Sequence, residues 1–178
     1  MTTAVSKKRI WGWIAFDWSA QPYYTLGLTF IFGPYFAFVA AQFYLGVELG
    51  PDMFGPATEK QMDDSDANAQ SIWALGQTCA GLFIALTAPF LGAFADTTGR
   101  KRPWIALFSI LYIIGAASLW FMQPDSTSLI LFLILFYLGF ISAESALNFV
   151  NAYLPSLGTD EEVGRISGLG ASIGYWGG

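Results

Sequence analysis

A carboxylate and two amides recur at helical spacing within one of the most apolar stretches of the sequence. Asn148 and Asn151 follow Glu144 at i+4 and i+7, which places the three side chains on one face of a helix. An ionisable group inside a bilayer is expensive, so we expect this stripe to face protein or water and to line or gate a solute pathway. The alternative is a hydrogen-bonded clamp between helices.

A second polar pair, Asp17 and Gln21, lies one helical turn apart early in the first apolar run. These side chains either line the same pathway or lie at the membrane interface, where Asp17 would be an ordinary helix N-cap. The chain has no histidine. Any proton coupling would therefore fall to Asp17 or Glu144, because a carboxylate in a poorly solvated site can load a proton. We expect no metal site and no cofactor.

A short basic segment, GAFADTTGRKR, begins at Gly92 and joins two apolar runs. Gly92 would allow two helices to approach closely, and Gly99 would allow a backbone turn that other residues disfavour. Asp96 precedes Arg100 by one helical turn, close enough to pair with it or with a group on another helix. Arg100 and Lys101 would hold the loop in the cytoplasm. The alternative is an ordinary basic loop on the cytoplasmic side that happens to contain an aspartate.

Three glycines, Gly170, Gly174 and Gly178, recur at every fourth position and predict close helix packing. The segment around Ser172 also fits the G-x-S-x-G nucleophile pattern. That pattern needs a strand-turn-helix setting and a histidine partner, and neither is expected here. We therefore predict no catalytic residue and no enzyme.

The composition indicates an all-α membrane protein. Hydrophobic residues make up 54% of the chain and charged residues only 12%, whereas soluble domains carry about 25% charged residues. Four long apolar runs are separated by polar breaks, and a fifth run is too short to span a bilayer. The predicted helices, which together form one incomplete N-terminal transmembrane bundle over residues 1–178, cover residues 12–45, 71–95, 104–122, 129–153 and 164–178.

The first helix is too long for one straight span, and Gly33-Pro34 is predicted to kink it. Residues 46–70 are rich in acidic residues and predict a solvated external connection. Seven of the eight basic residues fall on the opposite side of the membrane, which by the positive-inside bias makes the N-terminus cytoplasmic. These seven are Lys7, Lys8, Arg9, Arg100, Lys101, Arg102 and Arg165.

The segment from Gly92 to Lys101 resembles the loop signature G-x-x-x-D-x-x-G-R-K/R of the major facilitator superfamily. WIAFDWSA around Asp17 and NAYLP from Asn151 resemble segments of the vacuole-effluxer-like branch, which contains autophagy-related amino-acid effluxers. The resemblance implies the N-terminal part of a twelve-helix transporter that works by alternating access. This chain would then be an N-terminal fragment, with four complete transmembrane helices and the start of a fifth.

The resemblance also implies roles for the polar residues. Asp17 and Glu144 would line one central cavity, and Asp96 with Arg100 would latch the cytoplasmic side against a missing C-terminal helical half. The expected partners are the lipid bilayer, a small solute such as an exported amino acid, and a coupling proton, but no nucleic acid. The expected location is a bacterial inner membrane. The alternative function is a non-transporting scaffold or regulatory subunit that binds a membrane partner through its glycine face.

Overall fold

The computed structural model describes residues 6–45, 59–122 and 128–178, and within these ranges the chain is helical with no strand. The predicted all-α class is confirmed. The main helices are α1 (Lys7–Pro22), α2 (Phe32–Leu45), α3 (Glu59–Thr98), α4 (Lys101–Ser118), α5 (Leu129–Asn151) and α6 (Asp160–Gly177), with a π-helical segment η1 (Tyr23–Ile31) between α1 and α2.

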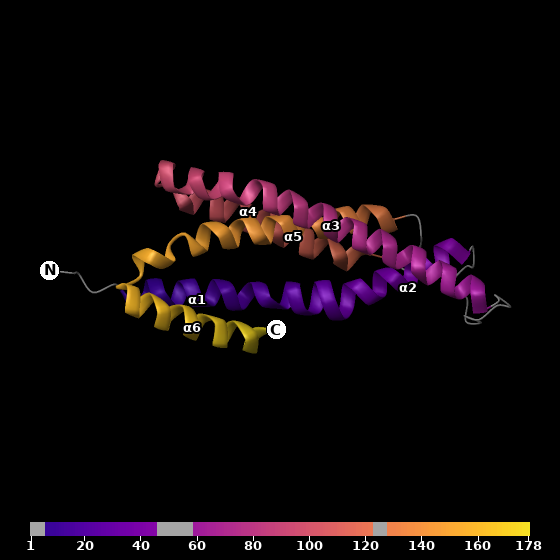
Figure 1. The fold of residues 1–178 in the computed structure, drawn as a ribbon, viewed down its shortest axis with the longest axis horizontal. Helices are drawn as coiled ribbons and strands as arrows, with labels where there is room; N and C mark the ends of the chain where they lie inside the picture. Colours follow the sequence, from indigo (N-terminus) through magenta and orange to yellow (C-terminus); the bar gives the residue numbers. More distant parts are fainter. Residues whose placement is uncertain (1–5, 46–58, 123–127) are drawn as a thin grey trace.

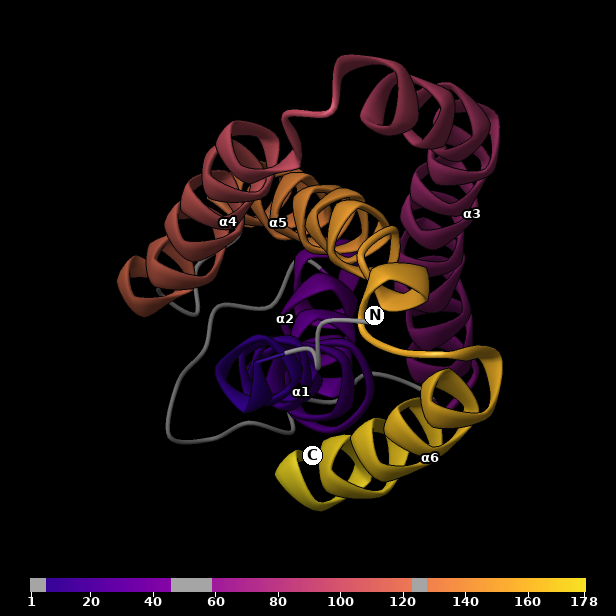
Figure 2. The same ribbon diagram turned by 90° about the vertical axis from the view of Figure 1, so that its left-hand side faces the viewer.

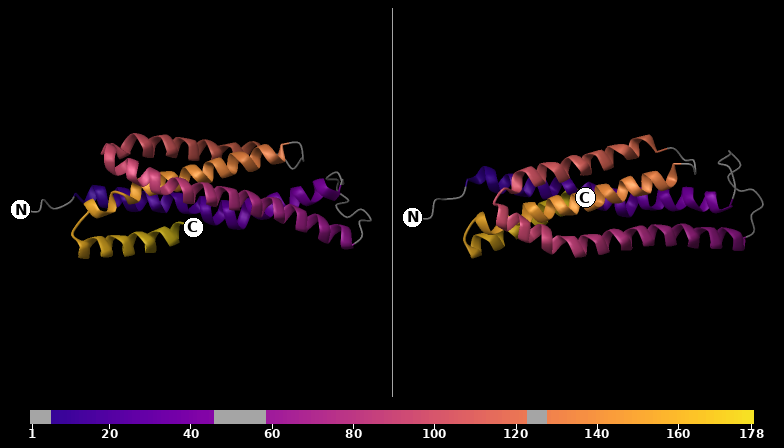
Figure 3. Two further views of the ribbon diagram at one scale, coloured as in Figure 1. Left: turned by 45° about the horizontal axis from the view of Figure 1, so that its top comes forward. Right: turned by 90° about the horizontal axis from the view of Figure 1, so that it is seen from above.

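The helices run along one long axis and form an elongated bundle (Figure 1). Seen along that axis, α1 lies between α5 and α6 (Figure 2). From above, α5 runs between α3 and α4 and packs against both (Figure 3). The start of α1, the turn between α3 and α4 and the start of α6 share one end of the bundle (Figure 1). The basic residues of these three segments therefore gather at the same end, which we call the basic end.

Four helical stretches of the described chain are long and apolar enough to cross a membrane. The outward faces of α3 and α4 are apolar, and Leu82, Phe90 and Ile113 are all more than half exposed. Exposed apolar side chains in such number are unfavourable in water and favourable against lipid. The four stretches are Lys7–Ala40, Ala67–Phe94, Lys101–Phe121 and Leu129–Ser156.

The first span changes its helical winding at its centre. The α-helix ends at Pro22, and η1 then widens the turns so that the Phe32 N–H donates to the Gly27 carbonyl five residues back. Proline at position 34 has no N–H to donate and its ring would crowd the carbonyl of Phe30, so a wider turn before it relieves this conflict. The change in winding therefore covers Tyr23–Ile31 and ends just before Gly33-Pro34, where the sequence predicts the kink.

Four of the five predicted helices begin earlier than predicted: the first begins at Lys7 rather than at residue 12, and α4 begins at Lys101 rather than at residue 104. α3 begins at Glu59 rather than at residue 71, and α6 begins at Asp160 rather than at residue 164. The prediction of a solvated loop over residues 46–70 is therefore wrong for residues 59–70, while residues 46–58 lie outside the described ranges. Hydropathy marks only the part of a helix inside the membrane, so polar turns beyond it are missed.

An aromatic cluster fixes α5 against the first span and α3. Phe136 of α5 is fully buried and stacks on Tyr23 and Phe32, with ring centroids 5.1 and 4.5 Å apart. The Tyr23 hydroxyl donates to the Phe136 carbonyl at 2.6 Å, and the Trp73 ring lies 5.4 Å from the Phe136 ring. These contacts hold the polar residues of the first span and of α5 in fixed positions relative to each other.

Two glycines let α4 approach α5. A Cβ at Gly115 would lie 2.7 Å from the Cα of Gly139, and a Cβ at Gly139 would lie 2.5 Å from the Tyr23 hydroxyl. Both positions therefore require glycine for this packing. Gly139 in particular leaves the space that the Tyr23 hydroxyl occupies.

Candidate functional site

The first half of the candidate site lies where α1 packs on α6. Asp17 and Gln21 are half-buried on neighbouring turns of α1, with their side chains close enough to interact. Both point toward Gly174 of α6, where a Cβ would lie 2.6 Å from Oδ2 of Asp17 and 3.5 Å from Nε2 of Gln21. Asp17 therefore faces protein inside the bundle and is not the N-cap of α1, a position that Ser6 occupies.

The second half of the site lies where η1 packs on α5. Glu144 of α5 is half-buried and interacts with the hydroxyl of Tyr24 in η1. The Tyr24 ring packs edge-on against Phe140 with centroids 5.8 Å apart. This aromatic contact holds the tyrosine beside α5, one turn from the carboxylate.

Tyr24 connects the two halves. Its hydroxyl interacts electrostatically with both Glu144 and Asp17. It is also buried, and it makes no hydrogen bond of normal geometry with any residue that the structure describes. A buried hydroxyl without a partner is uncommon and calls for an explanation such as a bound group. The structure thus brings two acidic side chains from different helices within electrostatic range of one buried hydroxyl.

Tyr24 is not among the site residues predicted from the sequence. The sequence did contain a signal for this residue. Gln21 lies four residues after Asp17 and Tyr24 lies seven after it, so the three side chains share one helical face. In an apolar run, however, a tyrosine at this spacing is also what a packed helix face contains. Only the position of α5, which brings Glu144 to Tyr24, distinguishes a tyrosine that binds a polar group from one that only packs.

The remaining members of the predicted stripe lie closer to the basic end. Asn148 is half-buried, and Asn151 is exposed at the last position of α5. Ser145 is buried next to Glu144, but its hydroxyl donates to the carbonyl of Ile141 at 2.7 Å. Glu144 is therefore the member of this stripe that the structure brings to Tyr24.

Two residues, Gly99 and Lys101, stabilise the turn between α3 and α4. Gly99 has a φ of 61°, the left-handed region in which glycine is favoured. Lys101 donates from Nζ to the Ala152 carbonyl at 2.8 Å, just beyond the C-terminus of α5, and lies 5.4 Å from the Tyr153 ring centroid. Arg100 is exposed. The side chain of Asp96 lies outside the described residues, so its pairing with Arg100 stays a prediction.

The expected close helix approach at Gly92 is not what the described residues show. No atom of theirs comes within 4 Å of a Cβ placed at Gly92. The contact between α3 and α4 is made instead by the rings of Phe94 and Trp104, whose centroids are 5.2 Å apart. Rings of this size hold the helices too far apart for a glycine contact.

The glycine face of α6 packs on α1 of the same chain. Gly170 meets the Trp13 ring, Gly174 meets Asp17, and Gly178 meets Thr25, each too closely to accept a Cβ without movement. Gly170 and Gly174 are buried. The alternative in which this face binds a separate membrane protein therefore conflicts with the structure, because the face is already covered.

The arrangement is suited to binding polar groups in the membrane interior. Within the described ranges, no three acidic, cysteine or histidine side chains come together as a metal ligand set. Two carboxyl groups, an amide and a phenol can accept from an ammonium group, donate to a polar solute and carry a proton.

Comparison with known proteins indicates the family to which the chain belongs. A family model described as "Vacuole effluxer Atg22 like" matches residues 5–166. The chain is 26% identical over 168 residues to the "Uncharacterized MFS-type transporter YxiO" of Bacillus subtilis (strain 168), which covers 93% of this chain. It spans 34% of the length of that curated relative. No solved structure matches the chain.

The helical bundle and its four apolar spans are those of an integral membrane protein, and the matched relative is described as an MFS-type transporter. Within that class, the chain belongs to the vacuole effluxer Atg22-like family.

Proposed function

We propose that this chain supplies one helical bundle of a secondary-active transporter that exports a small solute by alternating access. The observation that carries the proposal is the placement of Asp17 and Glu144, from two different helices, within electrostatic range of the buried hydroxyl of Tyr24. Polar groups inside a membrane are expensive and are retained where they meet a solute, an ion or water. Gln21 and Asn148 extend the same polar path along their helices.

The chemistry of the site favours a solute with an amino group, and we propose amino acids as the class. A carboxylate accepts well from an ammonium group, while the Tyr24 hydroxyl can donate to a solute oxygen. The family description as an effluxer supports export as the direction. Coupling to a proton would use the same two carboxyl groups, because the chain has no histidine.

The proposed orientation has the basic end in the cytoplasm. The beginnings of α1, α4 and α6 bring seven basic residues to this end (Figure 1), and positive charge near spans is retained on the cytoplasmic side. The location would be the cytoplasmic membrane of a bacterium. At this end Asp96 and Arg100 would form a gate, and Lys101 would anchor the turn to the end of α5.

The proposed mechanism needs a second bundle. In alternating access, two bundles rock around a site at their interface and expose it to each side in turn. The curated relative is about three times as long as the matched region, with this chain covering 34% of it. A C-terminal helical half is therefore proposed as the partner that closes the site around Asp17 and Glu144.

A binding measurement tests the proposal. The full-length protein in detergent would be melted with and without a mixture of the twenty standard amino acids, because a ligand that binds only the folded state raises its melting temperature. The mixture should raise Tm for the wild type and for Glu161→Gln, an exposed control with the same chemical change. It should not raise Tm for Glu144→Gln. Equal shifts in all three proteins would remove Glu144 from the site, and no shift in the wild type would remove amino acids as the class.

A further inference from the structure

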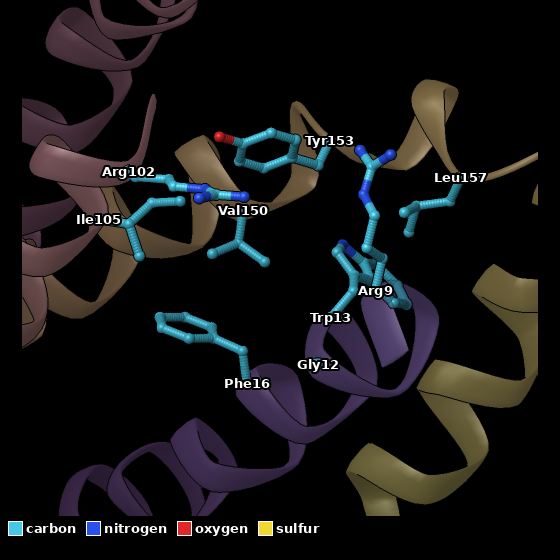
Figure 4. A pocket seen from close by; sticks show the side chains of 9 residues that line it. All are labelled: Arg9, Gly12, Trp13, Phe16, Arg102, Ile105, Val150, Tyr153 and Leu157. Atoms are coloured by element: carbon cyan, nitrogen blue, oxygen red, sulfur yellow. The ribbon is translucent and has the colours of Figure 1, made fainter. Parts of the chain in front are cut away.

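A separate pocket opens at the basic end of the bundle, between the start of α1, the start of α4 and the end of α5 (Figure 4). Its volume is about 300 Å³, enough for a group of several heavy atoms. None of its lining residues belongs to the site around Tyr24. They are Arg9, Gly12, Trp13, Phe16, Arg102, Ile105, Val150, Tyr153 and Leu157.

The pocket carries two positive charges and no negative one. The guanidinium groups of Arg9 and Arg102 lie on either side of the Tyr153 ring (Figure 4), and no carboxylate is among the lining residues. Arg9 donates from Nη2 to the Ser156 hydroxyl at 3.2 Å, which uses one of its five N–H donors. Two like charges beside one hollow repel each other, and an anion between them would remove that cost.

The pocket also holds a donor that lacks a partner. Trp13 is 9% exposed, and its indole N–H is buried without a hydrogen bond to any residue in the described ranges. An unsatisfied buried donor is unfavourable, and an acceptor oxygen that reaches it from the pocket would remove that cost.

We propose that this pocket binds the phosphate of an anionic phospholipid in the leaflet at the basic end. Guanidinium groups bind phosphate oxygens through paired N–H donors, and the Trp13 N–H would supply a further donor. The Phe16 and Val150 side chains supply apolar walls suited to the glycerol and upper acyl carbons. The spans Lys7–Ala40 and Lys101–Phe121 both begin here, which puts the pocket at headgroup depth.

Lipid titration of the purified protein tests the proposal. Native mass spectrometry would compare retention of phosphatidylglycerol with that of zwitterionic phosphatidylcholine, and a parallel arm would add inorganic phosphate alone. The test variants are Arg102→Gln, which leaves the Arg9–Ser156 hydrogen bond intact, and Trp13→Phe, which removes the N–H and keeps a ring. Arg165→Gln is the control, because Arg165 is exposed outside the pocket and carries the same charge.

The wild type should retain phosphatidylglycerol about tenfold better than phosphatidylcholine, with an order-of-magnitude loss in Arg102→Gln and a smaller loss in Trp13→Phe. Arg165→Gln should match the wild type. Binding of inorganic phosphate with the same dependence on Arg102 would support the phosphate site and assign it to a free anion. Equal losses in Arg102→Gln and Arg165→Gln, or no preference between the two lipids, would overturn the proposal. A destabilised variant is recognised by a lower melting temperature without lipid. In that case the preference of the wild type between the two lipids tests the proposal.

Discussion

The Tyr24 hydroxyl and the Glu144 carboxyl group meet across the interface between η1 and α5. Neither residue is positioned by this contact alone. The Tyr24 ring is held by Phe140, and α5 is held by the stack of Phe136 on Tyr23. Because packing fixes both partners, this contact can change without disturbing the fold, as the proposed binding of a solute or proton would require.

Removal of the Tyr24 hydroxyl should impair solute handling and leave stability nearly unchanged. Tyr24→Phe keeps the ring contact with Phe140 and deletes a hydroxyl that has no hydrogen bond in the described residues. We expect the affinity for the amino-acid mixture to fall about tenfold, or about 1.4 kcal/mol, while Tm changes by less than about 2 °C. Tyr175→Phe is the control, because Tyr175 is 87% exposed. A similar affinity in both variants would contradict a role for Tyr24.

An added methyl group on the glycine face of α6 should destabilise the protein. In Gly174→Ala the new Cβ would lie 2.6 Å from Oδ2 of Asp17, so either α6 or the Asp17 side chain must move. Overpacking of this kind costs about 1–3 kcal/mol. Gly168→Ala is a matched control on the same helix, because nothing lies within 4 Å of its Cβ position.

Gly168→Ala should be neutral or stabilising by up to about 1 kcal/mol, the helix propensity of alanine over glycine. Denaturant unfolding in detergent measures both variants. If Gly174→Ala is as stable as Gly168→Ala, the Asp17 carboxyl group is not held against Gly174 as described.

Loss of the Lys101 ammonium group should loosen the turn between α3 and α4. Lys101→Met removes the 2.8 Å bond to the Ala152 carbonyl and the contact with the Tyr153 ring, and keeps an apolar chain of similar length. A charged hydrogen bond of this kind contributes about 1.5–3 kcal/mol. Arg100→Gln, at an exposed neighbouring position, should have a much smaller effect. Unfolding free energies that fall equally in the two variants would show that only net charge matters here.

The start of α6 should be sensitive to acid. The Thr159 backbone N–H donates to Oε2 of Glu162 at 2.9 Å and its hydroxyl lies 3.2 Å from the same oxygen, which lowers the pKa of Glu162 below its usual range. A lowered folded-state pKa contributes stability above the unfolded pKa, about 4.3, and this contribution is lost as pH falls through the folded value.

Glu162→Gln, which cannot ionise, should therefore be less stable than the wild type near neutral pH. The difference should shrink as the pH is lowered below about 4. Unfolding curves of both proteins over a pH series measure this. Curves that stay parallel across the series would show that the ionised carboxylate contributes nothing to the cap.

The helical class and the spans could be read from the sequence, because apolar runs of membrane length have few other interpretations. Glu144 and Asp17 could be singled out for the same reason, since charge in such a run is rare. The position of Tyr24 could not, because an aromatic side chain in an apolar run has the same pattern whether it packs or binds.

Local geometry was the least predictable part. The π-helical turns of η1 arise from Pro34 acting on carbonyls before it, while a sequence reading places the bend at the proline itself. The glycine contact between Gly115 and Gly139 depends on two residues from different helices meeting at one height, which spacing along a single helix does not reveal. At Gly92 the sequence predicts a close helix contact that the described residues do not show, because the rings of Phe94 and Trp104 set the separation of α3 and α4.

The most direct test is solute efflux from proteoliposomes that contain the full-length transporter. Vesicles loaded with a radiolabelled amino-acid mixture would be compared for the wild type, Glu144→Gln, Asp17→Asn and the control Glu161→Gln, with and without an imposed pH gradient. We predict that the wild type and the control export label faster with the gradient, and that both site variants slow efflux at least about tenfold. Gradient-driven efflux that is unchanged in Glu144→Gln and Asp17→Asn would contradict the proposed site.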